Sequence, residues 1–200
     1  MSLVIGLHGA KGSGKDQFYK AVKAAYPLHP VRKIAYADPI KNEVCRIFGL
    51  KDEQEYDDFK RTEMRYQIPN KTTRSMDLRS VEGRQVVREI GMLMRSYDPN
   101  QFVRYVEETI ESEPGAVWCI TDLRFPNELL SIKSKLGGTV VKIKRNGVNF
   151  DGHVTETEFH DSVCDYVVYN TDLTLNQYNE LAIETMERIL DASLYNGEEV

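Results

Sequence analysis

The apolar residues of this chain fall into short runs separated by segments with helical spacing. Short segments that we interpret as strands occur at 3–8, 31–37, 116–120, 139–143 and 165–169, and 116–120 is a continuous apolar run, as expected of a buried parallel strand. Between them, apolar residues recur three or four positions apart at 16–25, 40–48, 83–96, 102–110, 126–136 and 173–194. This alternation predicts a three-layer α/β/α domain, with helices on both faces of a parallel sheet of about five strands.

One segment, 51–80, departs from this pattern. It is rich in Asp, Glu, Lys and Arg and has little aliphatic periodicity, so we predict a mobile insertion or partly helical flap rather than core. We expect a single domain over residues 1–200, with a substrate-binding flap at about 49–82 and a lid-like segment at about 145–160.

Composition argues against several classes of protein. Of the 200 residues, 41% are hydrophobic and 28% charged, as in soluble globular proteins, and the net charge of −5 argues against a nucleic-acid partner. Cys45, Cys119 and Cys164 form no CxxC pair, which argues against a zinc site or a disulfide framework. No apolar run approaches the roughly eighteen residues of a membrane span, and no signal-peptide pattern opens the chain. We therefore expect a cytoplasmic protein with no membrane partner.

The most informative motif joins the first strand to the first helix. Residues 9–16 read Gly-Ala-Lys-Gly-Ser-Gly-Lys-Asp and match the G-x-x-x-x-G-K pattern of a phosphate-binding loop. Glycines let backbone N–H groups turn toward a phosphate, the helix N-terminus adds its dipole, and the lysine supplies a cation. A structural glycine turn is the alternative. We predict a P-loop NTPase fold that binds ATP through Lys11, Gly12, Ser13, Gly14, Lys15 and Asp16.

Two acidic residues are candidate ligands of Mg²⁺. Asp16 stands where Ser or Thr usually holds the metal in such loops. Asp122 follows the buried 116–120 strand, as does the acidic residue that holds Mg²⁺ in P-loop enzymes. Either Asp16 reaches the ion, directly or through water, or Asp122 carries it and Asp16 only positions Lys15.

Arg124 lies two residues after Asp122 and is expected on the same side of the chain. Both residues follow a strand whose carboxyl end lies at the edge where an open α/β sheet binds its ligand. A surface Asp–Arg pair at a helix start is the alternative interpretation. We predict that Lys15, Asp122 and Arg124 form the catalytic group.

The 31–37 strand leads into Asp38-Pro39, which is typical of a helix start with Asp at the N-cap and Pro at the first helical position. Asp38 is either a cap alone or a cap that also contacts a ligand. Lys41 lies in the same first turn, where the helix dipole disfavours a cation. A bound anion would offset that cost.

Three arginines and a glycine share one face of the 83–96 helix. Arg84, Arg88, Gly91 and Arg95 are spaced at i, i+4, i+7 and i+11, beside an apolar face. Glycine costs about 1 kcal/mol of helix propensity relative to alanine, so we expect a close approach to the backbone at Gly91. Arginine suits bidentate phosphate recognition, which predicts a second anion site; a solvated basic face is the alternative.

Arg145 adds a basic residue after the 139–143 strand. It is either a lid residue over ATP or part of a solvated strand end. The four histidines form no ligand set for a metal.

Two anion sites, one for a donor triphosphate and one for an acceptor, indicate a small-molecule kinase. A phosphate monoester has a second pKa of about 6 and is substantially ionised at neutral pH. It therefore needs no strong general base, and catalysis reduces to alignment and charge neutralisation. The sequence fits this chemistry because it shows no Ser/His/Asp or Cys/His constellation.

Several motifs together resemble the phage deoxynucleoside monophosphate kinases (dNMP kinases). The loop at 9–16 looks like their G-x-K-x-S-G-K-D loop, in which Asp normally follows the lysine, and 122–128 (Asp-Leu-Arg-Phe-Pro-Asn-Glu) followed by Gly137-Gly138 is the most similar stretch. Further matches are 37–41 (Ala-Asp-Pro-Ile-Lys), Arg84 through Gly91, Phe102-Val103, His153-Val154-Thr155-Glu156 and Tyr169-Asn170. The resemblance covers most of the chain except 51–80.

The resemblance implies an adenylate-kinase-like P-loop fold and transfer of the γ-phosphoryl group of ATP to a dNMP, with Mg²⁺ as cofactor and the host cytoplasm as location. It assigns the deoxynucleotide to Lys41, Arg84, Asp122, Arg124 and Glu128. The wider expected substrate set adds Asp38, Arg88, Gly91, Met92, Arg95, Phe102 and Glu156.

Three positions depart from the family pattern, and those at 88 and 92, where the base is read, leave base preference open. Gln17 replaces a frequent Thr, Arg88 takes a Gln position and Met92 a Thr position. The alternatives are another P-loop kinase such as dephospho-coenzyme A kinase, which usually keeps Ser or Thr after the loop lysine, and a non-catalytic nucleotide-binding module. The N-K-x-D segment of switch GTPases is absent. The sequence leaves open whether the protein forms a homodimer.

Overall fold

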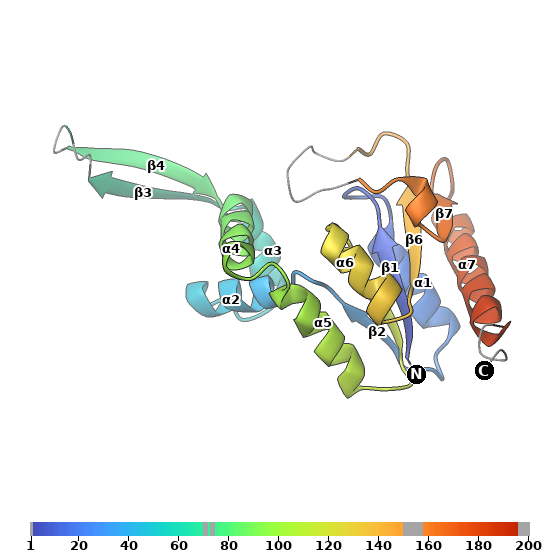
Figure 1. Cartoon of the computed structure of the whole chain (residues 1–200). Coiled ribbons are helices and arrows are strands. Elements are labelled where there is room, and N and C mark those ends of the chain that lie inside the picture. The colour runs from blue at the N-terminus through green and yellow to red at the C-terminus, as the bar shows by residue number, and fades with distance from the viewer. Residues whose placement is uncertain (1, 70–71, 73–74, 150–157, 196–200) are drawn as a thin grey trace. The chain divides into compact units, whose positions relative to one another are not determined.

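The computed structural model describes residues 2–69, 72, 75–149 and 158–195. The chain divides into two compact units (Figure 1), of which the first comprises Met1–Tyr36 and Val103–Val200 and the second Ala37–Phe102. Each unit has its own helices and its own sheet, so each is described by itself.

Unit 1 contains a five-stranded parallel sheet. Its strands are β1 (Leu3–His8), β2 (Val31–Ile34), β5 (Val117–Ile120), β6 (Thr139–Lys144) and β7 (Tyr166–Tyr169), in the order β2-β5-β1-β6-β7. Central β1 is almost entirely buried, as expected of a parallel strand covered on both faces. The predicted parallel sheet is confirmed, although β2 ends at Ile34 rather than at residue 37.

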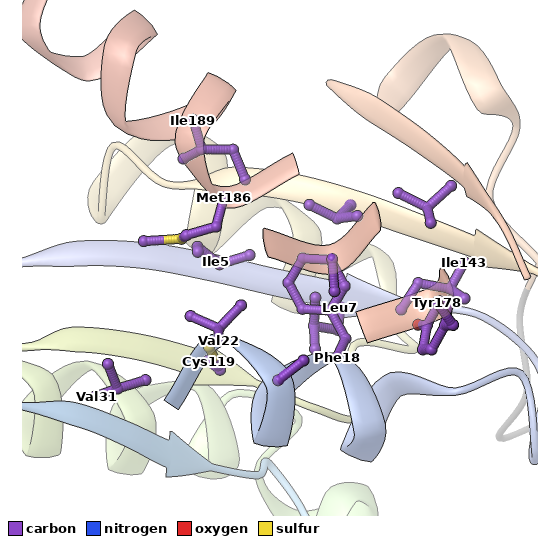
Figure 2. Close-up of a cluster of buried hydrophobic side chains, with 14 residues drawn as sticks. Ile5, Leu7, Phe18, Val22, Val31, Cys119, Ile143, Tyr178, Met186 and Ile189 are labelled. Carbon is purple, nitrogen blue, oxygen red and sulfur yellow. The ribbon is translucent and has the colours of Figure 1, made fainter. Parts of the chain in front are cut away.

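Helices cover both faces of this sheet. Ile5 and Leu7 point into a cluster with residues of α1 (Lys15–Ala25) and α7 (Leu175–Tyr195), among them Phe18 and Met186 (Figure 2). On the opposite face, the next residue of β1, Gly6, lies against Ile132. The three-layer arrangement follows from the alternation of side chains along β1. Among the described residues, no helix has the length and apolarity to cross a membrane.

The opposite face carries α5 (Gln101–Ser112), which begins in unit 2, and α6 (Pro126–Leu130). The helix predicted for 126–136 is confirmed, although its second half is not α-helical: α6 continues as a π-helical turn, η1 (Ser131–Lys135). There the Ser131 hydroxyl donates to Glu107 at 2.6 Å, and Lys135 pairs with the same carboxylate at 2.7 Å. Because Glu107 lies in α5, the apolar periodicity of 126–136 does not indicate these contacts.

Unit 2 contains α2 (Asp38–Phe48), α3 (Glu53–Arg61), α4 (Gly83–Tyr97) and a hairpin of β3 (Glu63–Pro69) and β4 (Met76–Glu82). The partly helical character predicted for 51–80 is confirmed by α3, but the hairpin was not predicted. Most residues of both strands are exposed, so the sequence lacks the apolar alternation that marks a strand with one buried face.

Two glycines of α4 are close to other elements of unit 2. A Cβ at Gly83 would lie 1.9 Å from the carbonyl oxygen of Phe59, whereas a Cβ at Gly91 would lie 2.7 Å from Cδ1 of Ile40. The first neighbour is backbone and the second is the end of a flexible side chain. A side chain at position 83 would therefore require the backbone to shift, whereas one at position 91 would require only the Ile40 side chain to move.

We expect Gly83→Ala to lower the free energy of unfolding by about 2 kcal/mol, because the added methyl group forces α3 and α4 apart. Gly91→Ala is the matched control: its Ile40 clash is relieved by a rotamer change, and alanine recovers about 1 kcal/mol of helix propensity. Urea unfolding of the two variants measures the difference. Equal stabilities would contradict this account of the α3–α4 contact.

Candidate active site

The loop between β1 and α1 has the geometry of a phosphate-binding loop. Gly9, Gly12 and Gly14 have φ values of 151°, 83° and 116°, which lie in the region that favours glycine. The Nζ atom of Lys15 donates to the carbonyl oxygens of Gly9 at 2.6 Å and Ala10 at 2.9 Å. The lysine therefore lies folded back over the loop, where a phosphate group could replace the carbonyl oxygens as its partner.

Two residues distant in sequence donate hydrogen bonds to the backbone of this loop. Asn170 Nδ2 donates to the carbonyl oxygen of Ser13 at 2.8 Å, and the Tyr178 hydroxyl donates to that of Gly14 at 3.0 Å. Burial raises the pKa of Tyr178, so its phenol remains a donor at neutral pH. The sequence does not indicate either contact, because Tyr178 lies within the predicted 173–194 helix and Asn170 is marked only by the resemblance.

Two polar groups lie where they could contact a nucleotide. The Arg145 Nη1 atom donates to the carbonyl oxygen of Gly12 at 3.3 Å, and its side chain is exposed. Ser13 is buried, and its Oγ has no hydrogen-bond partner among the described residues. An unsatisfied buried hydroxyl is costly, and a bound phosphate oxygen would supply its partner. Lys11, also in the loop, is exposed.

The two metal candidates differ in their surroundings. Asp16 is two-thirds exposed and pairs through Oδ1 with Lys33 of β2 at 2.6 Å. Asp122 is half-buried, and its Oδ1 accepts the backbone N–H of Tyr36 at 2.8 Å. Strands β1 and β5 are paired in parallel up to Gly6 opposite Ile120, so Asp122 and the first residue of the loop, Gly9, both follow the carboxyl ends of these two neighbouring strands.

The donor groups of this edge are compatible with Mg²⁺, with Asp122 and Asp16 as the two candidate carboxylates. Within the part of the chain that the structure describes, no three His, Cys, Asp or Glu residues gather around one point. Mg²⁺ does not require such a group, since it is commonly held by one or two carboxylates together with phosphate oxygens and water. Asp122 is half-buried and follows β5, the neighbour of β1 in the sheet, whereas Asp16 is two-thirds exposed and follows the loop lysine directly.

Glu128 shapes the turn that carries Arg124. It is fully buried, and its Oε2 accepts the backbone N–H groups of Arg124 at 2.8 Å and Phe125 at 3.0 Å. A buried carboxylate without such donors would be strongly destabilising. The resemblance implied that Glu128 holds the nucleotide; the structure shows it bound to the backbone of the turn that precedes α6.

In unit 2, the predicted start of the second helix is wrong by one residue. Ala37 is the N-cap of α2 and Asp38 lies inside the first turn, with no side-chain capping bond from Ala37. An acidic residue in the first turn interacts favourably with the helix dipole, so Asp38 is favourable for α2 at this position too. The Nζ atom of Lys41 pairs with Glu53 of α3 at 2.9 Å and lies 5.6 Å from the centre of the Tyr56 ring. The anion expected beside Lys41 is thus the Glu53 carboxylate in this structure.

The predicted arginine face lies on α4. Arg84 and Arg88 are half-buried, and the Arg95 guanidinium lies over the ring of fully buried Phe102 at 4.4 Å. The close approach expected at Gly91 exists, but the neighbour is Ile40 of α2. The neighbouring Met92 is exposed.

The structure thus groups the predicted residues within each unit. Unit 1 brings Lys15, Asp122, Arg124 and Arg145 to the carboxyl edge of its sheet, and unit 2 carries Lys41 and the α4 arginines. Glu156 and His153 lie outside the described residues. The lid-like segment at 145–160 therefore stays a prediction.

A buried histidine ends β1 at this edge. His8 is almost completely inaccessible; its Nε2 accepts the backbone N–H of Phe159 at 3.1 Å, and its Nδ1 lies 3.0 Å from the carbonyl oxygen of Leu123. Burial, the largest cause, lowers the pKa of His8 to about 4; the Leu123 carbonyl opposes this shift, and the charges of Lys142 and Lys15 add to it. The imidazole is therefore neutral at physiological pH.

This pKa predicts a pH-dependent stability. The unfolded chain binds a proton at His8 below the ordinary pKa of 6.5, whereas the folded chain binds it only near pH 4. The free energy of unfolding should therefore fall as pH is lowered through this window, by on the order of 2 kcal/mol at pH 5 from this residue. Urea unfolding at pH 7.5 and pH 5 measures the loss.

His8→Asn should flatten this pH dependence, while His29→Asn, at an exposed position, should leave it as in the wild type. An unchanged slope in His8→Asn would contradict the assignment of a neutral, buried imidazole.

Comparison with known proteins gives one relative over nearly the full length. The chain is 29% identical over 198 residues to a protein of Acanthamoeba polyphaga mimivirus named "Putative deoxynucleotide monophosphate kinase", covering 92% of this chain and 96% of that one. No family model matches. The relative confirms the resemblance that the sequence motifs indicate.

A solved structure, that of a gluconokinase from Sinorhizobium meliloti 1021, aligns over 98% of both chains with 14% identity and a TM-score of 0.48. That similarity is too low to support an argument about this chain. The description of the fold depends on the strand order and the phosphate-binding loop instead.

Proposed function

We propose that this protein is an ATP-dependent kinase that transfers the γ-phosphoryl group of ATP to a deoxynucleoside monophosphate, giving ADP and the diphosphate. The observation that carries the proposal is the glycine-rich loop after β1 with Lys15 folded over it, together with the Asp122 carboxylate, which follows the neighbouring parallel strand β5. Similarity to the mimivirus protein over nearly its whole length supports the choice of acceptor.

The loop would bind the phosphates of ATP. Its glycines expose backbone N–H groups at the start of α1, where the helix dipole favours an anion. Lys15 exchanges two carbonyl partners for charged phosphate oxygens, which form stronger hydrogen bonds. Ser13 Oγ gains the partner that it lacks among the described residues.

Asp122 is the residue that would hold Mg²⁺. When bound, the ion neutralises negative charge on the transferring phosphates. The backbone N–H of Tyr36 fixes one oxygen of this carboxylate and so limits the rotation of the side chain.

The acceptor monophosphate requires cations more than a base. Its second pKa of about 6 leaves it largely ionised at neutral pH, and Lys41 with the α4 arginines supplies positive charge in unit 2. Lys41 would leave Glu53 to bind it. That exchange costs little, because Glu53 is largely exposed and such surface pairs contribute roughly 0–1 kcal/mol.

Lys15→Ala should lower kcat for ADP release by about 100-fold or more, because it removes a cation from the charge that develops in transfer. The comparison is wild type and variant with ATP and each of the four common dNMPs, with circular dichroism to check the fold. A folded variant that retains full activity would rule out the loop as the ATP site.

Arg124→Ala should raise the KM for the dNMP by about 10-fold or more while changing the KM for ATP much less, since a charge-assisted hydrogen bond to phosphate contributes roughly 1.5–3 kcal/mol. Arg46→Ala, which removes an exposed arginine paired with Glu43, is the control and should change neither constant. If both KM values rise equally in Arg124→Ala, this arginine does not distinguish acceptor from donor.

A further inference from the structure

His8 connects three segments at the carboxyl edge of the sheet in unit 1. It is the last residue of β1 and directly precedes Gly9 of the loop. The backbone N–H of Phe159 can only donate, so the Nε2 atom that receives it carries no proton. In the neutral imidazole the proton is then on Nδ1, which donates to the carbonyl oxygen of Leu123 at 3.0 Å.

The Leu123 carbonyl belongs to the turn that contains two predicted catalytic residues, Asp122 and Arg124. That turn is held at three successive residues. Tyr36 N–H binds the Asp122 carboxylate, His8 binds the Leu123 carbonyl, and the Glu128 carboxylate binds the Arg124 amide. Of these three contacts, the one from His8 joins the turn to β1, the strand that leads into the phosphate-binding loop.

We propose that His8 is a positioning residue, whose Nδ1–H···O=C bond to Leu123 sets the Asp122–Arg124 turn relative to the phosphate-binding loop. This inference rests on the proposed function. It concerns the alignment of the groups that act on the transferring phosphoryl, and misplacements of about 1 Å at such groups can cost about 100-fold in rate.

The second bond of the imidazole, to Phe159, is backed by another contact. The buried Lys142 Nζ donates to the Phe159 carbonyl oxygen at 2.5 Å and pairs with Asp161 at 3.0 Å. Loss of the Nε2 acceptor would therefore leave Phe159 attached to β6, whereas loss of the Nδ1 donor would leave the Leu123 carbonyl without its bond to β1.

Two substitutions separate the two bonds. An asparagine amide can place its N–H near the position of Nδ1 and keep the bond to Leu123, while a glutamine can place its carbonyl near Nε2 and keep the bond to Phe159. We expect His8→Asn to keep kcat within about threefold of wild type, and His8→Gln to lower kcat by about 10-fold or more with little change in the KM for ATP, as is typical when a supporting residue is lost.

Both variants are compared with wild type for kcat, both KM values and Tm. A merely structural role predicts similar losses of Tm in the two variants and equal kcat in their folded forms, and that result would overturn the inference. The same conclusion follows if His8→Asn loses more kcat than His8→Gln.

If His8→Gln does not fold, His8→Ala with added imidazole replaces it, and the expected result is a kcat that rises with imidazole; no rise would overturn the inference. Wild-type protein that phosphorylates no monophosphate overturns the proposed function and this inference with it. Active wild type with equal variants overturns the inference alone.

Discussion

Parallel pairing of β1 with β5 is the constraint on which the rest of the candidate site in unit 1 depends. It puts the carboxyl ends of both strands at one edge, where β1 leads into the loop that begins at Gly9 and β5 leads into the turn that contains Asp122. Strand β2 pairs with β5 in the same direction and brings the N–H of Tyr36 to the Asp122 carboxylate. A shift of one residue in either pairing would turn these groups to the opposite face.

The same edge carries several buried polar groups, each of which has partners. Glu128 binds two backbone amides, His8 binds one carbonyl and one amide, and Lys142 binds Glu158, Asp161 and the Phe159 carbonyl. Buried polar groups stabilise a fold only when they are satisfied. Here Glu128 and His8 bind the backbone of the turn that contains Asp122 and Arg124.

The strands of the main sheet and the phosphate-binding loop were predictable because each has a local pattern. Continuous apolar runs mark β1 and β5, and the glycine spacing with Lys15 marks the loop. The β3–β4 hairpin was missed because its strands are mainly exposed and bury too few apolar residues to show a period of two.

The supports of the site escaped prediction for a different reason. Asn170, Tyr178 and His8 act through hydrogen bonds to residues more than a hundred positions away. The residues next to them in the sequence do not indicate these partners. Gly91 shows the opposite case. Its helix propensity correctly indicated a close neighbour, but only packing could identify that neighbour as Ile40.

The central claim is that the loop and the Asp122–Arg124 turn serve transfer to a monophosphate. The most direct test follows the γ-phosphoryl group itself, with ATP labelled at the γ-phosphorus and each dNMP supplied in turn with Mg²⁺. The account predicts label in the deoxynucleoside diphosphate, at a rate that depends on which dNMP is present. Label recovered only as inorganic phosphate, or left in ATP with every dNMP, would contradict it.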